Sequence, residues 1–301
     1  MTKNSEKYKE KKQNNFTAAK IAILSDIHGN SPALKAVLED IQKENCTQLY
    51  VLGDIINGLD PGGCLELLSE LENILYVKGN AEHYLLTPDL DKFPKKDESF
   101  FPLLIKRLNW WRQMTPGKFI ELIRKMPDYI ISDGSFFVHD SPLDRYYPER
   151  KRIEGIAEKY QELCYHGNGI LPSMNKEGLQ EISSFLDSKQ LLRLFCGHNH
   201  FAFKKEVYGK FICNAGSVGL PLDGNPRAAW VLLDKAAENE EIKIKRVEYD
   251  IDKTVNHLYA TDAPFECSKK DYEKMLRTGF YWKESVAEWA RKTQLPFIKN
   301  F

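Results

Sequence analysis

Five short motifs along the chain contain the residue types that bind divalent metal ions. Their candidate ligands are Asp26, His28, Asp54, Asn80, His139, His198 and His200. A mixed set of oxygens and imidazoles suits Mn, Fe, Zn or Ni, whereas Ca²⁺ prefers oxygens alone and structural Zn²⁺ prefers thiolates. Seven ligands are too many for one ion, but they fit two ions that share one carboxylate. Two ions roughly 3.5–4 Å apart generate hydroxide near neutral pH and hold the attacking and leaving oxygens of a phosphoryl displacement.

The first three motifs each follow a short apolar segment, which we interpret as a buried parallel strand. These segments are residues 21–24, 49–52 and 74–77. Ser31 and Pro32 introduce an amphipathic helix after the first segment, so the pattern is that of successive β-α units. Ligands of open α/β sheets bind at the carboxyl ends of the strands. Residues two apart on an extended chain face the same side, so we expect Asp26 and His28 to converge on one point.

The second half of the chain has the pattern of further strands, mostly antiparallel. We expect them at residues 129–131, 135–138, 191–196, 201–207, 211–214, 228–233 and 242–249, followed by helices at 270–277 and 281–292. Asp133-Gly134 predicts a tight hairpin between the first two of these strands. Asn57-Gly58 is interpreted as no more than a turn. His139 follows the second strand of this series and His198 follows the third, so these imidazoles also lie at strand ends.

Residues 84–127 interrupt the strand pattern with aromatic, proline-punctuated helical sequence. We predict helices at 100–114 and from Thr115-Pro116 onward, which together form a cap inserted beside the metal site. Trp110 and Trp111 could stack on a nucleobase, but packing of this helix on its neighbour is the favoured interpretation.

With these motifs, the sequence resembles the calcineurin-like metallophosphoesterase family, whose pattern is D-x-H, G-D, G-N-H-[DE], an isolated His, and G-H-x-H. The match covers most of residues 21–233, and the runs HDSPLD and GSVGLPLDGNPRA are similar to signatures of a bacterial and archaeal branch of phosphoesterases. The resemblance implies a two-sheet α/β/β/α sandwich with the site at the strand ends. It also implies that metal 1 is held by Asp26, His28 and His200, that metal 2 is held by Asn80, His139 and His198, and that Asp54 bridges them.

One position departs from the family pattern, because Ala81 stands where G-N-H-[DE] has its histidine. The resemblance gives that histidine a role in assisting the leaving group, and a general acid typically contributes about 10²- to 10⁴-fold. His83, His166 and Arg145 are the candidate catalytic groups that could replace it. We expect His83 to point away from the site and His166 either to line the site or to lie at the surface. Arg145 could clamp a phosphate or pair with a surface carboxylate.

The overall composition limits the classes of partner. Lys+Arg and Asp+Glu both number 43, so the formal net charge is zero, which argues against binding to nucleic-acid backbones or anionic membranes. The six cysteines form no C-x-x-C pair, as expected of reduced thiols. Residues 1–20 lack the apolar region of a signal peptide, and no stretch reaches the roughly 18 apolar residues of a membrane helix. We therefore expect a disordered lead-in and a cytoplasmic protein.

These observations together predict an α/β protein with the two-sheet α/β/β/α architecture and an inserted helical cap. The expected parts are the lead-in at 1–20, a metallophosphoesterase domain at 21–279 with its cap at 84–127, and a helical tail at 280–301.

The predicted function is a dinuclear phosphodiesterase that hydrolyses a small or nucleotide-like phosphate ester with a metal-bridging hydroxide, with Mn as the favoured metal and Fe, Zn or Ni as alternatives. A Ser/Thr protein phosphatase or a dinucleoside polyphosphate hydrolase would use the same chemistry. A non-catalytic scaffold of the same fold is the alternative from another class. A Rossmann enzyme is disfavoured, since no G-x-G-x-x-G follows any strand.

Overall fold

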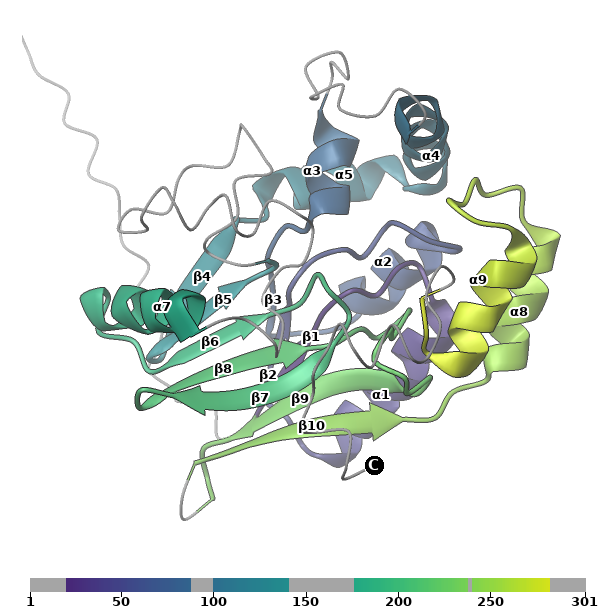
Figure 1. Ribbon diagram of the computed structural model, residues 1–301. Helices are drawn as coiled ribbons and strands as arrows, with labels where there is room; N and C mark the ends of the chain where they lie inside the picture. The colour runs from purple at the N-terminus through teal and green to yellow at the C-terminus, as the bar shows by residue number, and fades with distance from the viewer. Residues whose placement is uncertain (1–19, 88–99, 141–175, 238–239, 282–301) are drawn as a thin grey trace, which may run out of the picture.

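Two β-sheets face each other, and helices cover their outer faces (Figure 1). The computed structural model describes residues 20–87, 100–140, 176–237 and 240–281. One sheet has the strand order β10-β9-β1-β2-β3 and the other β4-β5-β6-β8-β7. The strands are β1 (Lys20–Leu24), β2 (Gln48–Val51), β3 (Ile74–Tyr76), β4 (Tyr129–Ser132), β5 (Ser135–Val138), β6 (Arg193–Cys196), β7 (Ala202–Val207), β8 (Lys210–Ala215), β9 (Ala228–Asp234) and β10 (Glu241–Val247). This architecture confirms the predicted α/β/β/α sandwich.

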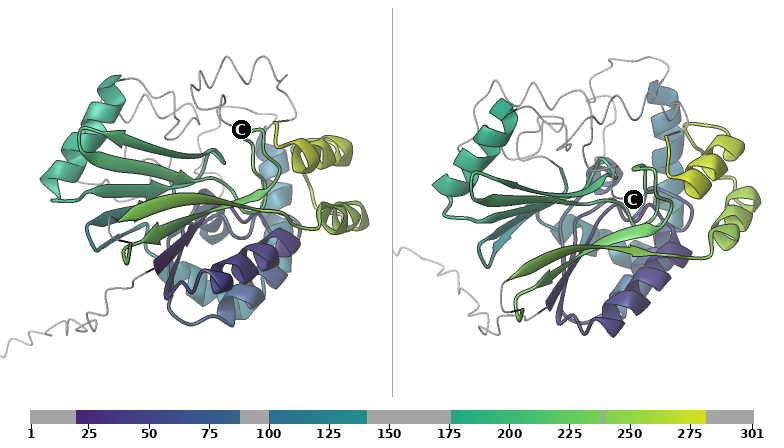
Figure 2. Two further views of the ribbon diagram at one scale, coloured as in Figure 1. Left: turned by 90° about the horizontal axis from the view of Figure 1, so that it is seen from below. Right: turned by 60° about the horizontal axis from the view of Figure 1, so that its bottom comes forward.

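The helices form the outer layers and one side of the molecule. They are α1 (Ser31–Lys43), α2 (Pro61–Ser69), α3 (Asn80–Leu86), α4 (Phe100–Met114), α5 (Gly117–Lys125), α7 (Lys176–Ser188), α8 (Ile251–Ala260) and α9 (Lys269–Thr278). Helix α1 lies against the sheet that contains β1, and α7 lies against the sheet that contains β6, as the two turned views in Figure 2 show. Helices α3, α7 and α8 were not among the predicted elements.

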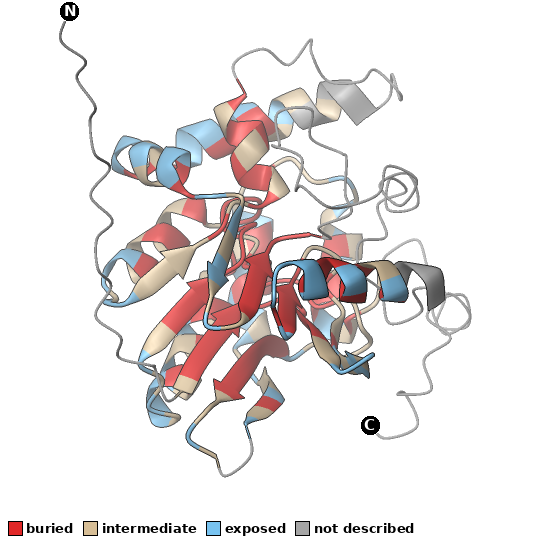
Figure 3. Ribbon diagram, turned by 90° about the vertical axis from the view of Figure 1, so that its left-hand side faces the viewer, coloured by how far each residue is buried: buried red, intermediate tan, exposed pale blue. Residues whose placement is uncertain are grey.

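The strand β1 shows why its sequence is apolar throughout. Ile21 and Ile23 point into the core between the two sheets, whereas Ala22 and Leu24 point into the core beneath α1 and α2. A strand covered on both faces needs apolar residues at every position. Figure 3 shows the result as continuous burial along the central strands. Strands β1, β2 and β3 are parallel, as predicted, so their carboxyl ends share one edge of the sheet.

The strands of the second half pair mostly antiparallel, as predicted, but the sheet that contains β6 is mixed. Its middle strands β5, β6 and β8 are parallel, and β4 and β7 pair antiparallel at its two edges. The predicted hairpin is confirmed, since Asp133 and Gly134 connect β4 to β5 with φ of 55° and 69°. Two positive φ angles at the turn are typical of the I′ hairpin. The parallel middle strands bring the ends of β5 and β6 to the same edge as those of β1, β2 and β3.

The predicted cap is mostly helical in its described residues, 84–87 and 100–127, and its apolar face belongs to the main core. Leu108, Trp111, Phe119 and Ile123 are buried in the same cluster as residues of β1, α1 and α2. The predicted packing of Trp111 is therefore confirmed, and α4 and α5 are part of the helical layer over the first sheet. Whether the segment shapes substrate access stays a prediction.

Several predictions about the chain ends lie outside the described residues. These are the lead-in, apart from Lys20 in β1, and the helix at 281–292, apart from its first residue. Within the ranges that the structure describes, no helix is long and apolar enough to cross a membrane.

Candidate metal centre

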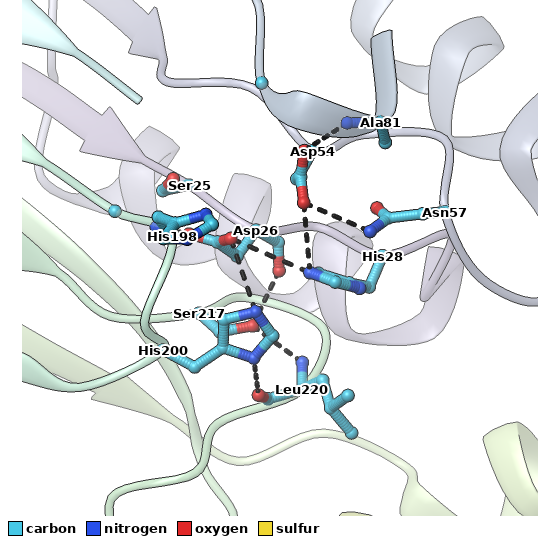
Figure 4. A network of polar contacts seen from close by, with 12 residues as sticks. Ser25, Asp26, His28, Asp54, Asn57, Ala81, His198, His200, Ser217 and Leu220 are labelled. Atoms are coloured by element: carbon cyan, nitrogen blue, oxygen red, sulfur yellow. Dashed lines mark hydrogen bonds and ion pairs between the residues drawn. The ribbon is translucent and has the colours of Figure 1, made fainter. Parts of the chain in front are cut away.

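The structure brings the seven candidate ligands together from the ends of five strands in two sheets. Asp26 and His28 follow β1, Asp54 follows β2, Asn80 begins α3 after β3, His139 follows β5, and His198 and His200 follow β6. Figure 4 shows the part of this cluster around Asp26 and Asp54. Hydrogen bonds connect the loops of the two sheets here, since the His198 N–H after β6 donates to Oδ2 of Asp26 and the Gly219 N–H, between β8 and β9, donates to the Asp26 carbonyl.

One group of side chains surrounds Asp26. Its Oδ1 lies 3.3 Å from Nε2 of His200 and 3.6 Å from Nε2 of His28. The two imidazole rings meet edge to face with centroids 4.5 Å apart. One ligand atom from each of these three side chains falls within 4.8 Å of the other two. The three residues thus form a compact set of one carboxylate and two imidazoles.

The charges in this set depend strongly on one another. Burial raises the pKa of Asp26, but attraction to His200 together with the polar contacts to His200 and His28 outweighs burial and holds the pKa well below its usual range. Burial, followed by repulsion from His200, lowers the pKa of His28. Burial would also lower the pKa of His200, but attraction to Asp26 raises it. The ionised Asp26 therefore favours positive charge beside it.

The second group surrounds Asn80 and Asp54. The Asn80 Oδ1 lies 3.0 Å from Nε2 of His139 and 3.0 Å from Nδ1 of His198. The Asp54 Oδ1 is 3.5 Å from the same His139 nitrogen. Asp26, Asp54 and His139 likewise offer ligand atoms within 4.8 Å of one another. Asp54 therefore lies between the two groups, because its Oδ2 is 3.8 Å from Nε2 of His28.

Backbone carbonyls fix two of the imidazoles in the form that a metal ion needs. The His139 Nδ1 lies 2.6 Å from the Leu52 carbonyl, and the His200 Nδ1 lies 2.6 Å from the Leu220 carbonyl. A carbonyl can only accept, so each Nδ1 carries the proton, and in the neutral ring Nε2 presents a lone pair. In neutral rings those lone pairs face carboxylate oxygens, which is unfavourable unless a proton or a metal ion lies between them.

Two buried polar atoms in the first group have no hydrogen-bond partner among the described residues. They are Oδ1 of Asp26 and Nε2 of His28. A buried polar atom left unpaired costs about 1–3 kcal/mol. A divalent cation would satisfy both atoms at once. The residues present therefore fit the metal-ion site that their types predict.

The backbone conformation corrects one step of the sequence reasoning. The strand β1 ends at Leu24, and Asp26 and His28 adopt left-handed φ angles of 54° and 49°. Alternation along an extended strand therefore does not bring these side chains together. Asp54 (52°), His198 (72°) and His200 (62°) are also left-handed. Non-glycine residues in this region cost about 1–3 kcal/mol each and gather at functional sites.

Glu82 supports the loop that carries Asp54, and sequence reasoning assigned it no role. It is fully buried, and its carboxylate accepts three backbone N–H bonds, each 2.8 Å long, from Asp54, Ile55 and Gly79. Burial and the nearby Asp54 raise the pKa of Glu82, while the three N–H donors oppose the rise. The acidic position in G-N-H-[DE] was the signal that could have identified it.

The run GSVGLPLDGNPRA contributes hydrogen bonds that support the candidate metal centre. The Ser217 hydroxyl donates to the Asp26 carbonyl at 2.6 Å and accepts the Leu220 N–H at 2.8 Å. The Leu220 carbonyl in turn accepts Nδ1–H of His200. Ser217 thus connects the loop of Asp26 to the group that orients His200.

The three candidate catalytic groups have different outcomes. The His83 Nε2 lies 2.9 Å from the Asp128 carboxylate, and its side chain is 16% exposed. Its role as an acid stays a prediction. Arg145 and His166 lie outside the described residues. Ala81 is fully buried and belongs to the apolar core, so the position that holds histidine in the family pattern is filled by packing here.

Comparisons with known proteins agree with this geometry. Residues 19–237 match the model of the calcineurin-like phosphoesterase superfamily domain. An uncharacterized protein of Methanocaldococcus jannaschii is 28% identical over 256 residues, which cover 81% of this chain and 93% of that protein. The crystal structure of a metallophosphoesterase from Sphaerobacter thermophilus matches with a TM-score of 0.60 and 23% identity, covering 87% of this chain and 99% of that one. A hypothetical protein from Pyrococcus horikoshii matches with a TM-score of 0.63 and 20% identity, covering 88% and 99%.

Proposed function

Since the chain belongs to the calcineurin-like phosphoesterase superfamily, we propose that it is a phosphodiesterase that uses two divalent metal ions. The substrate class is a small or nucleotide-like phosphate diester. Mn²⁺ is the metal we favour among Mn, Fe, Zn and Ni, all of which a donor set of oxygens and imidazoles can hold. The observation that carries the proposal is the geometry around Asp54, whose two carboxylate oxygens face different groups of imidazoles.

In this proposal the chain divides its ligands between two ions. Metal 1 would be held by Asp26, His28 and His200, metal 2 would be held by Asn80, His139 and His198, and both would share Asp54. When bound, the ions would supply activated water and would stabilise the charge on the phosphate. Nδ1–H bonds to Leu52 and Leu220 keep the rings of His139 and His200 in the orientation that binds metal.

The preference for diesters follows from the residue at position 81. A histidine there would protonate a poor leaving group, and Ala81 has no group that can do so. An activated aryl diester leaves without much protonation, whereas an alkyl phosphomonoester leaves as a poor alkoxide. We therefore assign diesters with good leaving groups as substrates. His83, Arg145 and His166 stay as the residues to mutate if the enzyme protonates leaving groups after all.

The cellular setting is part of the proposal. The five cysteines in the described part of the chain are all free thiols. Free thiols are typical of a reducing compartment, which supports a cytoplasmic enzyme acting on a small-molecule substrate.

The experiment combines metal analysis with a substrate panel. Purified protein is expected to contain or take up two Mn²⁺ per chain and to hydrolyse an aryl phosphodiester faster than an alkyl monoester. Protein that binds no divalent metal would contradict the site. Equal rates on both esters would contradict the diester assignment but leave the metal site intact. Faster cleavage of a dinucleoside polyphosphate than of any diester would favour the alternative hydrolase.

A further inference from the structure

Asn57 lies in the candidate metal centre and does more than form a turn. Its side chain is buried, with the residue 6% exposed, and its Nδ2 donates to Oδ2 of Asp54 at 3.1 Å. Its Oδ1 is also buried and has no hydrogen-bond partner in the described part of the chain. The neighbouring Gly58 allows this loop to lie against the loop that carries His28, because a Cβ there would lie 1.6 Å from the His28 carbonyl oxygen.

The bond from Asn57 fixes the rotation of the Asp54 carboxylate. The Asp54 Oδ1 accepts the Ala81 N–H at 2.8 Å and lies on the side of His139. Its Oδ2 accepts the Asn57 amide and lies on the side of His28. Figure 4 shows the two donors on different oxygens of the same carboxylate. With one donor on each oxygen, the carboxylate cannot rotate without losing a bond, and each oxygen stays directed at one group of imidazoles.

We propose that Asn57 is a positioning residue that holds Asp54 in the bridging orientation. This inference rests on the two-metal site of the proposed function. The side chain of Asn57 makes no hydrogen bond to the backbone in the described region, so it does not hold the loop together. Its buried, unpaired oxygen opposes folding, since leaving such an atom without a partner costs stability. A residue that stabilised only the turn would not need this amide.

The test separates metal affinity from folding. Asn57→Leu keeps a similar volume and removes both polar atoms of the amide. Full-length protein is stripped with a chelator, titrated with Mn²⁺ by calorimetry, and unfolded in urea without metal. Loss of a residue that orients a ligand typically weakens metal binding by about 10- to 100-fold. We therefore expect the Kd of at least one Mn²⁺ to rise by about that factor, while the urea midpoint of the metal-free protein stays the same or increases.

The matched control is Trp230→Phe, which removes a different, partly buried hydrogen bond. The Trp230 Nε1 donates to the Asp40 carboxylate at 3.0 Å on α1, and no candidate ligand takes part. This control should lower the urea midpoint and leave both Mn²⁺ affinities unchanged. Should Asn57→Leu fail to fold, Asn57→Ala carries the same expectation for Mn²⁺.

The outcomes separate the role of Asn57 from the existence of the metal site. If an Asn57 variant loses stability as the control does but binds two Mn²⁺ as tightly as wild type, Asn57 is structural and the inference is overturned. If wild type itself binds no Mn²⁺, the proposed function fails and the inference fails with it.

Discussion

Replacing Glu82 by glutamine tests whether a buried carboxylate holds the bridging loop. The Glu82 Oε2 accepts the N–H groups of Asp54 and Gly79, and its Oε1 accepts the N–H of Ile55. Glutamine has nearly the same shape, but one of its two terminal atoms is an NH₂ group. If its oxygen takes the place of Oε2, the Ile55 N–H faces a donor and loses its acceptor.

The expected size of the effect follows from these three bonds. One buried N–H without a partner costs about 1–3 kcal/mol, and hydrogen bonds to a charged acceptor contribute about 1.5–3 kcal/mol each. Burial opposes the charge of Glu82, as the raised pKa shows, so losing the charge recovers part of that cost. We therefore expect Glu82→Gln to lower the free energy of unfolding by about 1–3 kcal/mol. Glu82→Ala leaves all three N–H groups unpaired and should cost at least about 3 kcal/mol.

Urea unfolding of the metal-free protein measures both variants against wild type. Mn²⁺ titration of the folded proteins then measures the effect on the site, where Glu82→Gln should weaken binding because the loop carries Asp54. The reasoning is refuted if Glu82→Gln is as stable as wild type and binds Mn²⁺ equally well. It is also refuted if Glu82→Gln and Glu82→Ala lose the same stability, because the three bonds would then have no individual effect.

Three further predictions concern other residues. Asp54→Asn should abolish activity and lower the metal content by at least one ion, and elemental analysis showing two tightly bound ions would contradict the bridging role. Ala81→His should lower stability by about 1–3 kcal/mol, because the position is fully buried, and should raise monoester hydrolysis only modestly. If the Ala81→His variant unfolds at the same urea concentration as wild type, the imidazole ring fits without disturbing the core, which would contradict this prediction. In a Cys164→Ser variant, thiol reagents should label the native protein slowly at neutral pH, since burial raises the pKa of Cys46 and Cys267 to about 11 and that of Cys213 to about 12. Rapid labelling without urea would contradict these raised pKa values.

The central buried strands could be predicted from sequence, because short runs that are apolar at every position are explained by burial on both faces of a sheet. Residues 21–24 are apolar at every position, and only a strand buried on both faces requires that in so short a segment. Helix α8 was missed although it has an ordinary start, in which the Asp250 carboxylate accepts the Lys253 N–H at 2.8 Å. The alternating pattern of residues 242–249 was extended as a strand up to this cap and left the helix unrecognised.

The ligand residues could be predicted from their types and their order along the chain, but not from the geometry of an extended strand. Their types and order along the chain were enough to indicate a metal site, whereas the extended-chain alternation used for Asp26 and His28 does not occur. Both residues are left-handed instead, and backbone bonds to the next loop hold them there. The Asp26 N–H donates to the Gly53 carbonyl at 3.1 Å, and the His28 N–H donates to the Asp54 carbonyl at 2.9 Å. Such long-range bonds have no local sequence signal.

Asn57 and Glu82 position Asp54, although the G-D motif that contains Asp54 includes neither of them. Asn57 and Glu82 contact opposite ends of Asp54, one its side-chain carboxylate and the other its backbone N–H. Without Glu82 the Asp54 N–H would lose its acceptor, and without Asn57 the Asp54 carboxylate could rotate while the backbone stays in place. The position of the bridging carboxylate therefore depends on two side chains that bind no metal. The two supports differ in their effect on stability: the unpaired amide oxygen of Asn57 carries a cost, whereas the three backbone bonds that Glu82 accepts stabilise the loop.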